Sequence, residues 1–230
     1  MKLYFLLEDQ KSFLKVLPAW LKVCLPKYVQ VFSVDDFSNN SYIAESGFGY
    51  PSIKNVLVNK LEMFSDSDIR PDCIVVMYDV DDWSENYQAT VRAKFDNIFI
   101  ASGLDVDYKI LPIKRCFESW LLGNKEVYPK KADDKFKIYE NFYDVSKNDP
   151  EIMDCPNEYR DSISIYHYNY LQCMLKTSIG KKYTKGNPSI VGNNNYLAGM
   201  NQRIDSTLDM NSFREFMNFL VSTSRNSVYE

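Results

Sequence analysis

The sequence feature that most limits the fold is the stretch from Cys73 to Trp83, which begins apolar and ends in three aspartates. Ile74 to Tyr78 contains no polar alternation, and such a run is typical of a strand buried on both faces of a parallel sheet. In open α/β sheets the ligand crevice lies just beyond the carboxyl ends of the strands. This stretch therefore predicts a central strand that leads directly into a binding edge.

The aspartates that follow this strand have a spacing that matters. Asp79 and Asp81 are two residues apart, so a strand-like backbone points both side chains to the same side. Hard oxygen ligands at a strand end suit Mg²⁺ or Mn²⁺. The alternative is a plain turn, because Asp is a favoured turn residue.

The first half of the chain alternates between strand-like and helix-like segments. We expect strands at 3–7, 29–34, 74–78 and 108–113, helices at 11–25, 51–61, 86–95 and 116–123, and a loop at 38–50. Residues 98–100 fit either a short strand or a helix end, and Pro112 places its strand toward a sheet edge or marks a strand end. The alternation predicts an α/β fold with a mainly parallel sheet flanked by helices.

From Asn124 onward the character of the sequence changes. The segment is charged and carries Pro129, Pro150 and Pro156, and further helices are predicted at 166–178 and 212–222. We therefore expect an α/β core over residues 1–125 and a mostly helical extension over residues 126–230 that packs on the core.

Composition narrows the function classes. A net charge of −4 argues against a generally basic nucleic-acid coat, although a local basic patch fits. The five cysteines form no C-x-x-C pair, which favours a reducing cytoplasm. No membrane segment is predicted, and the apolar start of the chain meets Glu8 and Asp9 without a cleavage signature, so we interpret it as a strand.

Acidic residues recur at strand ends or strand-to-helix junctions: Glu8, the Asp79, Asp81 and Asp82 group, and Glu118. Carboxylates at the ends of neighbouring strands can share a divalent cation, which polarises a phosphate and activates water. Each also has an ordinary explanation. Glu8 and Asp9 suit a helix N-terminus, and a carboxylate at position 118 is either partnered or exposed.

The order of these elements resembles the Toprim domain of topoisomerases, primases and defence nucleases. In that domain a Glu follows the first strand and an Asp-x-Asp follows a central strand, and here these are Glu8, Asp79 and Asp81. The resemblance covers roughly residues 1–125. It implies a Toprim-like sheet that holds Mg²⁺ or Mn²⁺ for breaking or joining phosphodiester bonds.

A small bacterial branch of that group, often encoded beside ATPases in phage-defence loci, is similar over more of the chain. The matching elements are Glu8, the Tyr78–Asp82 stretch, the Arg115–Leu121 stretch with its Glu-x-Trp, and Lys182-Tyr183-Thr184-Lys185. This resemblance implies a cytoplasmic nuclease, a hydrolase that acts in antiviral defence on DNA or RNA with an ATPase partner.

The resemblance also implies roles for single residues. Glu8, Asp79 and Asp81 would bind metal and act in catalysis with Lys182, and Asp82 and Glu118 would assist at the metal. Nucleic acid would contact the side chains of Lys181, Lys182, Lys185 and Arg115, with Arg203 a lesser candidate. The alternative for the lysines is a solvated loop.

One departure from the family pattern lies after the first strand. Members usually carry Gly after the first Glu and a second acid shortly beyond it, whereas this chain has Asp9 and then Lys11-Ser12. Asp9 could substitute for the second acid. The alternative is a copy that keeps the fold as a binding or regulatory module without catalysis.

Overall fold

The computed structural model describes residues 1–81 and 84–226. Its centre is a parallel sheet with strand order β2-β3-β1-β4-β5. The strands are β1 (Lys2–Leu7), β2 (Val29–Gln30), β3 (Ser41–Ser46), β4 (Cys73–Val80) and β5 (Asp107–Lys114). The predicted α/β class with a parallel sheet is confirmed.

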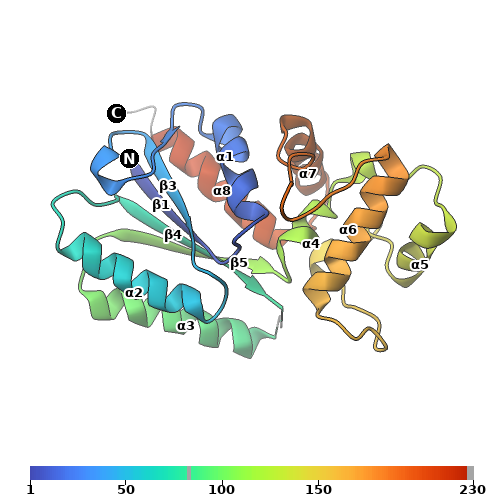
Figure 1. Cartoon of the computed structure of the whole chain (residues 1–230), viewed down its shortest axis with the longest axis horizontal. Helices are drawn as coiled ribbons and strands as arrows, with labels where there is room; N and C mark the ends of the chain where they lie inside the picture. The colour runs from blue at the N-terminus through green and yellow to red at the C-terminus, as the bar shows by residue number, and fades with distance from the viewer. Residues whose placement is uncertain (82–83, 227–230) are drawn as a thin grey trace.

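Helices cover both faces of this sheet, as Figure 1 shows. One face carries α2 (Ser52–Ser65) and α3 (Glu85–Ser102), and the other carries α1 (Phe13–Cys24) and α8 (Asn211–Asn226). Side chains of β4 alternate between the two layers, with Val75 facing α1 and Val76 facing α2 and α3. Burial on both faces explains why β4 is apolar throughout.

The rest of the chain is helical and lies beside the sheet (Figure 1). It contains α4 (Phe117–Leu121), α5 (Asp134–Phe142), α6 (Ile163–Ile179) and α7 (Asn194–Ser206), with short 3-10 turns at Lys125–Val127 and Pro150–Ile152; a further 3-10 turn, Val34–Asp36, lies between β2 and β3. The hydrophobic core does not stop at residue 125. It runs from β1 through Trp120 to Phe213 and Phe216 of α8, so the last helix belongs to the cover of the sheet.

Two strand predictions were wrong. The predicted loop at 38–50 contains β3, which pairs with β1 on one side and β2 on the other. Its polar residues have partners, since Glu45 accepts a hydrogen bond from the hydroxyl of Tyr4 and pairs with Lys60. The predicted strand at 29–34 ends after Gln30, because it lies at the sheet edge and Phe32 is 83% exposed.

Other elements agree with expectation or extend it. Residues 98–100 are the end of α3, and β5 with Pro112 is an edge strand. The helix α7 was not predicted, because its sequence is rich in Asn and polar residues. Its N-terminus is capped by the side chain of Asn193, which accepts a hydrogen bond from the backbone N–H of Tyr196.

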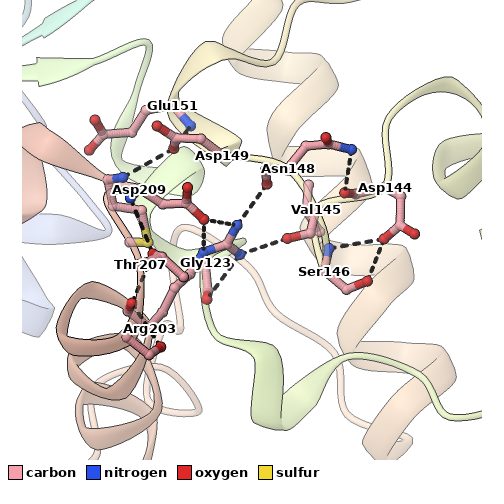
Figure 2. Close-up of polar contacts among 12 residues, drawn as sticks. Gly123, Asp144, Val145, Ser146, Asn148, Asp149, Glu151, Arg203, Thr207 and Asp209 are labelled. Carbon is pink, nitrogen blue, oxygen red and sulfur yellow. Dashed lines mark hydrogen bonds and ion pairs between the residues drawn. The ribbon is translucent and has the colours of Figure 1, made fainter.

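A buried arginine ties the helical region together, as Figure 2 shows. The guanidinium of Arg203 donates to the backbone carbonyls of Gly123, Val145 and Asn148 and to the carboxylate of Asp209. Its side chain is fully buried, so Arg203 is a structural residue that a nucleic acid cannot reach.

Candidate functional site

The carboxyl ends of β1, β4 and β5 meet at one edge of the sheet. The parallel register pairs Leu7 with Met77 and Asp79 with Ile113, so residues just beyond these strands become neighbours. The backbone N–H of Glu8 donates to the carbonyl of Met77 at 2.8 Å, which extends the pairing by one residue. The acidic residues of three strand ends are thereby brought to the same edge.

Glu8 is held by backbone groups. Its Oε1 accepts from the N–H of Tyr50 at 3.2 Å, and its Oε2 accepts from the N–H of Asp79 at 3.0 Å. Burial raises the pKa of Glu8, the two backbone hydrogen bonds oppose that shift, and the charges of Asp81 and Asp9 add to it. The Glu8 carboxylate thus joins the ends of β1 and β4 and has a fixed position.

Asp79 is the least compensated of the acidic groups. It is half-buried and its side chain points to the α1 face of the sheet, since it continues the alternation of Val75 and Met77. Burial raises its pKa well above the usual value, and repulsion from Glu8 and Glu118 raises it further. Within residues 1–81 and 84–226, no hydrogen-bond donor contacts its carboxylate. The positive charge of Lys185 lowers the pKa of Asp79 but does not offset burial and the two neighbouring carboxylates.

Asp81 lies at the exposed rim of the same edge. Partial desolvation raises its pKa, while the positive charges of Arg115 and Lys185 lower it. Asp82, the third aspartate of the predicted group, lies outside the described residues. Asp81 is therefore the described carboxylate that lies nearest to solvent at this edge.

Glu118 lies in the first turn of the short helix α4, which follows β5 after two residues, and is only 1% exposed. Its Oε1 accepts from the hydroxyl of Tyr183 at 3.0 Å, and its Oε2 lies 3.5 Å from the Nζ of Lys185. Burial raises the pKa of Glu118, and the contacts with Lys185 and Tyr183 lower it. Glu118 is thus partnered, and its partners come from the late basic segment.

The lysines of that segment divide into two groups. Lys185 faces the carboxylates: burial opposes its charge, but Glu118 and Asp79 raise its pKa above the usual value. Lys181 and Lys182 are exposed and line a separate pocket beside α6. The structure therefore brings Lys185, and not the predicted catalytic Lys182, to the acidic edge.

Arg115 closes the edge between β4 and β5. Its Nη1 donates to the carbonyl of Asp81 at 2.6 Å, and its Nη2 pairs with Asp154 at 3.1 Å. Arg115 has a left-handed backbone conformation with φ 68°, which residues other than glycine rarely adopt. Arg115 fixes the backbone of Asp81, which leaves less of its guanidinium for a nucleic acid.

Asp9, the residue that could replace the family's second acid, is engaged elsewhere. Its Oδ1 accepts from the backbone N–H groups of Lys11, Phe13 and Leu14, and its Oδ2 accepts from the hydroxyl of Ser12. These contacts cap the start of α1. Asp9 contributes negative charge to the edge, but both of its oxygens already have donors.

Two contributors to the site were not predicted from the sequence. Tyr183 reaches Glu118 with its hydroxyl, and the segment that carries it is held by α1, since Nζ of Lys15 donates to the carbonyl of Gly186 at 2.6 Å. The backbone N–H of Tyr50 supports Glu8. The sequence could have indicated Tyr183, because it lies between lysines. It could not have indicated the N–H of Tyr50, because a backbone donor is present in almost every residue.

The acidic edge partly fits a divalent cation. No group of three His, Cys, Asp or Glu side chains lies at ligand spacing within the described part of the chain. Glu8 and Asp79 supply oxygen at adjacent strand ends, and Mg²⁺ commonly takes one or two carboxylates and completes its shell with water and phosphate. The repulsion at Asp79 is the feature that a bound cation would relieve.

Comparisons with family models, with curated proteins and with solved structures gave no match to this chain. The resemblance to the Toprim group therefore stays a prediction.

Within residues 1–81 and 84–226, no helix has both the length and the apolar character needed to cross a bilayer.

Proposed function

We propose that this chain is a divalent-metal-dependent nuclease that hydrolyses phosphodiester bonds of DNA or RNA with Mg²⁺ or Mn²⁺. One observation carries the proposal. The half-buried Asp79 carboxylate has no donor within the described residues and is repelled by Glu8 and Glu118 at the ends of three parallel strands. Lys185 offsets this repulsion only in part, and a buried carboxylate with so little compensation is costly unless it serves a ligand.

The metal would be held by Glu8, Asp79 and Asp81, with Asp82 as a further candidate. When bound, it would orient and polarise a phosphate and activate water for in-line attack. Glu118 supports this site indirectly, because its two oxygens hold Tyr183 and Lys185. Lys185, whose side chain is 40% exposed, is the group best placed to contact the charged phosphate.

The family resemblance extends the proposal to biological context. We propose an effector subunit in a cytoplasmic anti-phage system that works with an ATPase partner. The net charge of −4 supports dependence on a partner, because the chain lacks the general basic surface that draws nucleic acid by itself.

The test is a cleavage assay on single- and double-stranded DNA and RNA with Mg²⁺ or Mn²⁺. Asp79→Asn is expected to lower the rate by at least about 1000-fold, since it removes the central carboxylate and keeps its shape. Asp105→Asn is the matched control, because Asp105 is exposed before β5, at the opposite end of that strand. Equal cleavage by wild type and Asp79→Asn would refute the proposal.

A second candidate function is a binding or regulatory module that keeps the fold without catalysis. Two observations favour it: Asp9 is committed to capping α1, and the described residues form no three-carboxylate cluster. Titration calorimetry with Mn²⁺ in the presence of nucleic acid separates the two candidates. Absence of metal binding would favour the module over the nuclease.

A further inference from the structure

A second concave site lies away from the acidic edge, between α5 and α6. The pocket has a volume of about 740 Å³, which is within the range of small-molecule sites. Helix α5 contributes Tyr139, the loop before α6 contributes Tyr159, and α6 contributes Tyr166. Nothing in the proposed cleavage chemistry uses this pocket.

Its apolar surface is aromatic. Tyr166 is buried and packs edge-on against Tyr159 with ring centroids 5.0 Å apart, and Tyr139 lies 5.5 Å from the same ring. Tyr139 and Tyr159 are only half-buried. Tyr139 stacks on Tyr170 with ring centroids 4.9 Å apart, so one of its faces is covered from within the protein. Partly exposed tyrosine rings over such an aromatic floor are surfaces on which nucleobases stack.

Its rim is basic. The lining includes the exposed residues Lys135, Lys176, Lys181 and Lys182, and none of its described members is Asp or Glu. This concentration of positive charge occurs in a chain whose net charge is −4. Asp133 lies nearby, bonded to Thr177, but the four lysines outnumber it and suit a phosphate group.

Amide groups between the rings and the lysines add hydrogen-bonding capacity. Asn169 donates to the hydroxyl of Tyr159 at 2.8 Å, which fixes that ring. Gln172 donates to the hydroxyl of Tyr168 and to the carbonyl of Tyr183, both at 2.7 Å. Gln172 therefore connects the pocket to the segment whose Tyr183 touches Glu118.

From these features we infer that the pocket between α5 and α6 binds a nucleotide, with its base on Tyr139 and Tyr159 and its phosphate at the lysines. The inference goes beyond the proposed function, because binding here needs no metal and no cleavage. The nucleotide can be free or the terminal unit of a single strand. A strand held here would have a short path to the acidic edge, since Lys182 and Lys185 are three positions apart in the chain, a span of at most about 11 Å.

The experiment measures binding of nucleoside 5′-monophosphates and of 5′-phosphorylated DNA and RNA hexamers to the full chain, in EDTA, by calorimetry or fluorescence anisotropy. Lys176→Gln combined with Lys181→Gln is expected to weaken hexamer binding about tenfold and to reduce the slope of log K against log salt by about 1.4. Lys22→Gln combined with Lys94→Gln removes two exposed lysines from α1 and α3 and is expected to change neither.

A second pair of variants isolates stacking. Tyr159→Ala is expected to weaken binding about tenfold, whereas Tyr159→Phe keeps the ring and retains most of the affinity. If both free monophosphates and hexamers bind, the ligand is a nucleotide as such. If only hexamers bind, it is a strand terminus.

Several results would overturn the inference. These are no binding of any nucleotide or hexamer by wild type, equal affinity in wild type and the lysine variant, and complete competition by inorganic phosphate alone at equal concentration. Binding of anionic vesicles but not of nucleotides, lost in the same variants, would also overturn it. Binding that fails in Asp79→Asn but survives the pocket variants would place nucleic acid at the acidic edge only. Conversely, nucleotide binding in the pocket without any cleavage activity would support this inference and refute the proposed nuclease function.

Discussion

Two buried charged clusters in this protein are built in opposite ways. Around Arg203 each group has a partner: the guanidinium meets Asp209 and three carbonyls, and nearby Glu151 accepts from the hydroxyl and backbone N–H of Ser212 and from the N–H of Phe213. At the acidic edge Glu8 and Glu118 both repel Asp79, and Lys185 is the described lysine that faces these carboxylates.

The difference separates a structural role from a functional one. A buried charge that is fully hydrogen-bonded fixes the conformation of the chain around it, and removing one partner is strongly destabilising. Carboxylates that lie close together with only partial compensation reduce the stability of the fold, and proteins accept such a cost where a ligand is bound. The four predictions below test this contrast.

The largest expected effect is at the compensated cluster. Arg203→Met should lower the free energy of unfolding by about 3–5 kcal/mol, because it leaves Asp209 and three carbonyls without their donor. Urea unfolding followed by circular dichroism measures the change. Arg92→Met is the control, since Arg92 is exposed on α3 and its pair with Asp96 is long at 3.9 Å. Similar losses in both variants would contradict the contrast.

His167, a buried ionisable residue of the helical region, tests whether this region tolerates a buried charge that has no compensating partner. His167 is buried against Cys116 and the carbonyl of Met153, and burial lowers its pKa to about 3. The unfolded chain therefore binds more protons than the folded chain between pH 3 and 6.5. Within that window the His167 contribution to stability is lost as pH falls, by about 2 kcal/mol between pH 7 and pH 5.

His167→Gln isolates this contribution, because the buried carboxyls Glu118 and Glu151 have raised pKa values and shift stability in the opposite direction. The difference in unfolding free energy between wild type and the variant should shrink as the pH falls from 7 to 5. Urea titrations at several pH values provide the measurement. A difference that stays constant would show that His167 takes up a proton in the folded protein.

At the uncompensated cluster a substitution should stabilise. Asp79→Asn removes the repulsion with Glu8 and Glu118, and we expect the free energy of unfolding to rise by about 1 kcal/mol while cleavage is lost. Thermal unfolding in EDTA measures this without bound metal. A destabilised Asp79→Asn would mean that its carboxylate has a structural partner and would weaken the proposed function.

The smallest expected effect concerns Lys185. Lys185→Gln should change the free energy of unfolding by no more than about 1 kcal/mol, because the Lys185 side chain is 40% exposed and its buried partner Glu118 keeps the hydroxyl of Tyr183. Removing this cation should tighten Mn²⁺ binding by about two- to fivefold and weaken nucleic acid binding. Calorimetric titrations with Mn²⁺ and with nucleic acid check that the two affinities change in opposite directions. Lys182→Gln serves as the comparison and should leave Mn²⁺ binding unchanged.

Much of the fold was predictable because local pattern and burial agree. The apolar run of β4 and the helical periodicity of α8 identify those elements directly. The strand β3 was missed because its Ser and Glu residues find partners only in the folded protein. Likewise, β2 is short because it lies at the edge of the sheet, and its residue types do not show where it ends.

The site shows the same division. Parallel register places the residues after β1 and β4 side by side, so the closeness of Glu8 and Asp79 follows from the strand assignment alone. Which lysine reaches Glu118 depends on the path of residues 180–186, which Lys15 and Gln172 hold by hydrogen bonds to backbone carbonyls. Such contacts to the backbone are independent of residue type at the accepting position, so the sequence does not reveal them.

The position of α8 on the sheet has a consequence for biosynthesis. Phe219 of α8 packs edge-on against Phe5 of β1 with ring centroids 6.4 Å apart, although more than 200 residues separate them in the chain. At ribosomal rates of 5–20 residues per second, α8 is synthesised roughly 10–40 s after β1. During that time α1 can cover part of this face, and the part that α8 covers is open to other nascent chains and to chaperones. Expression yield should therefore depend on how fast the last helix follows the first strand.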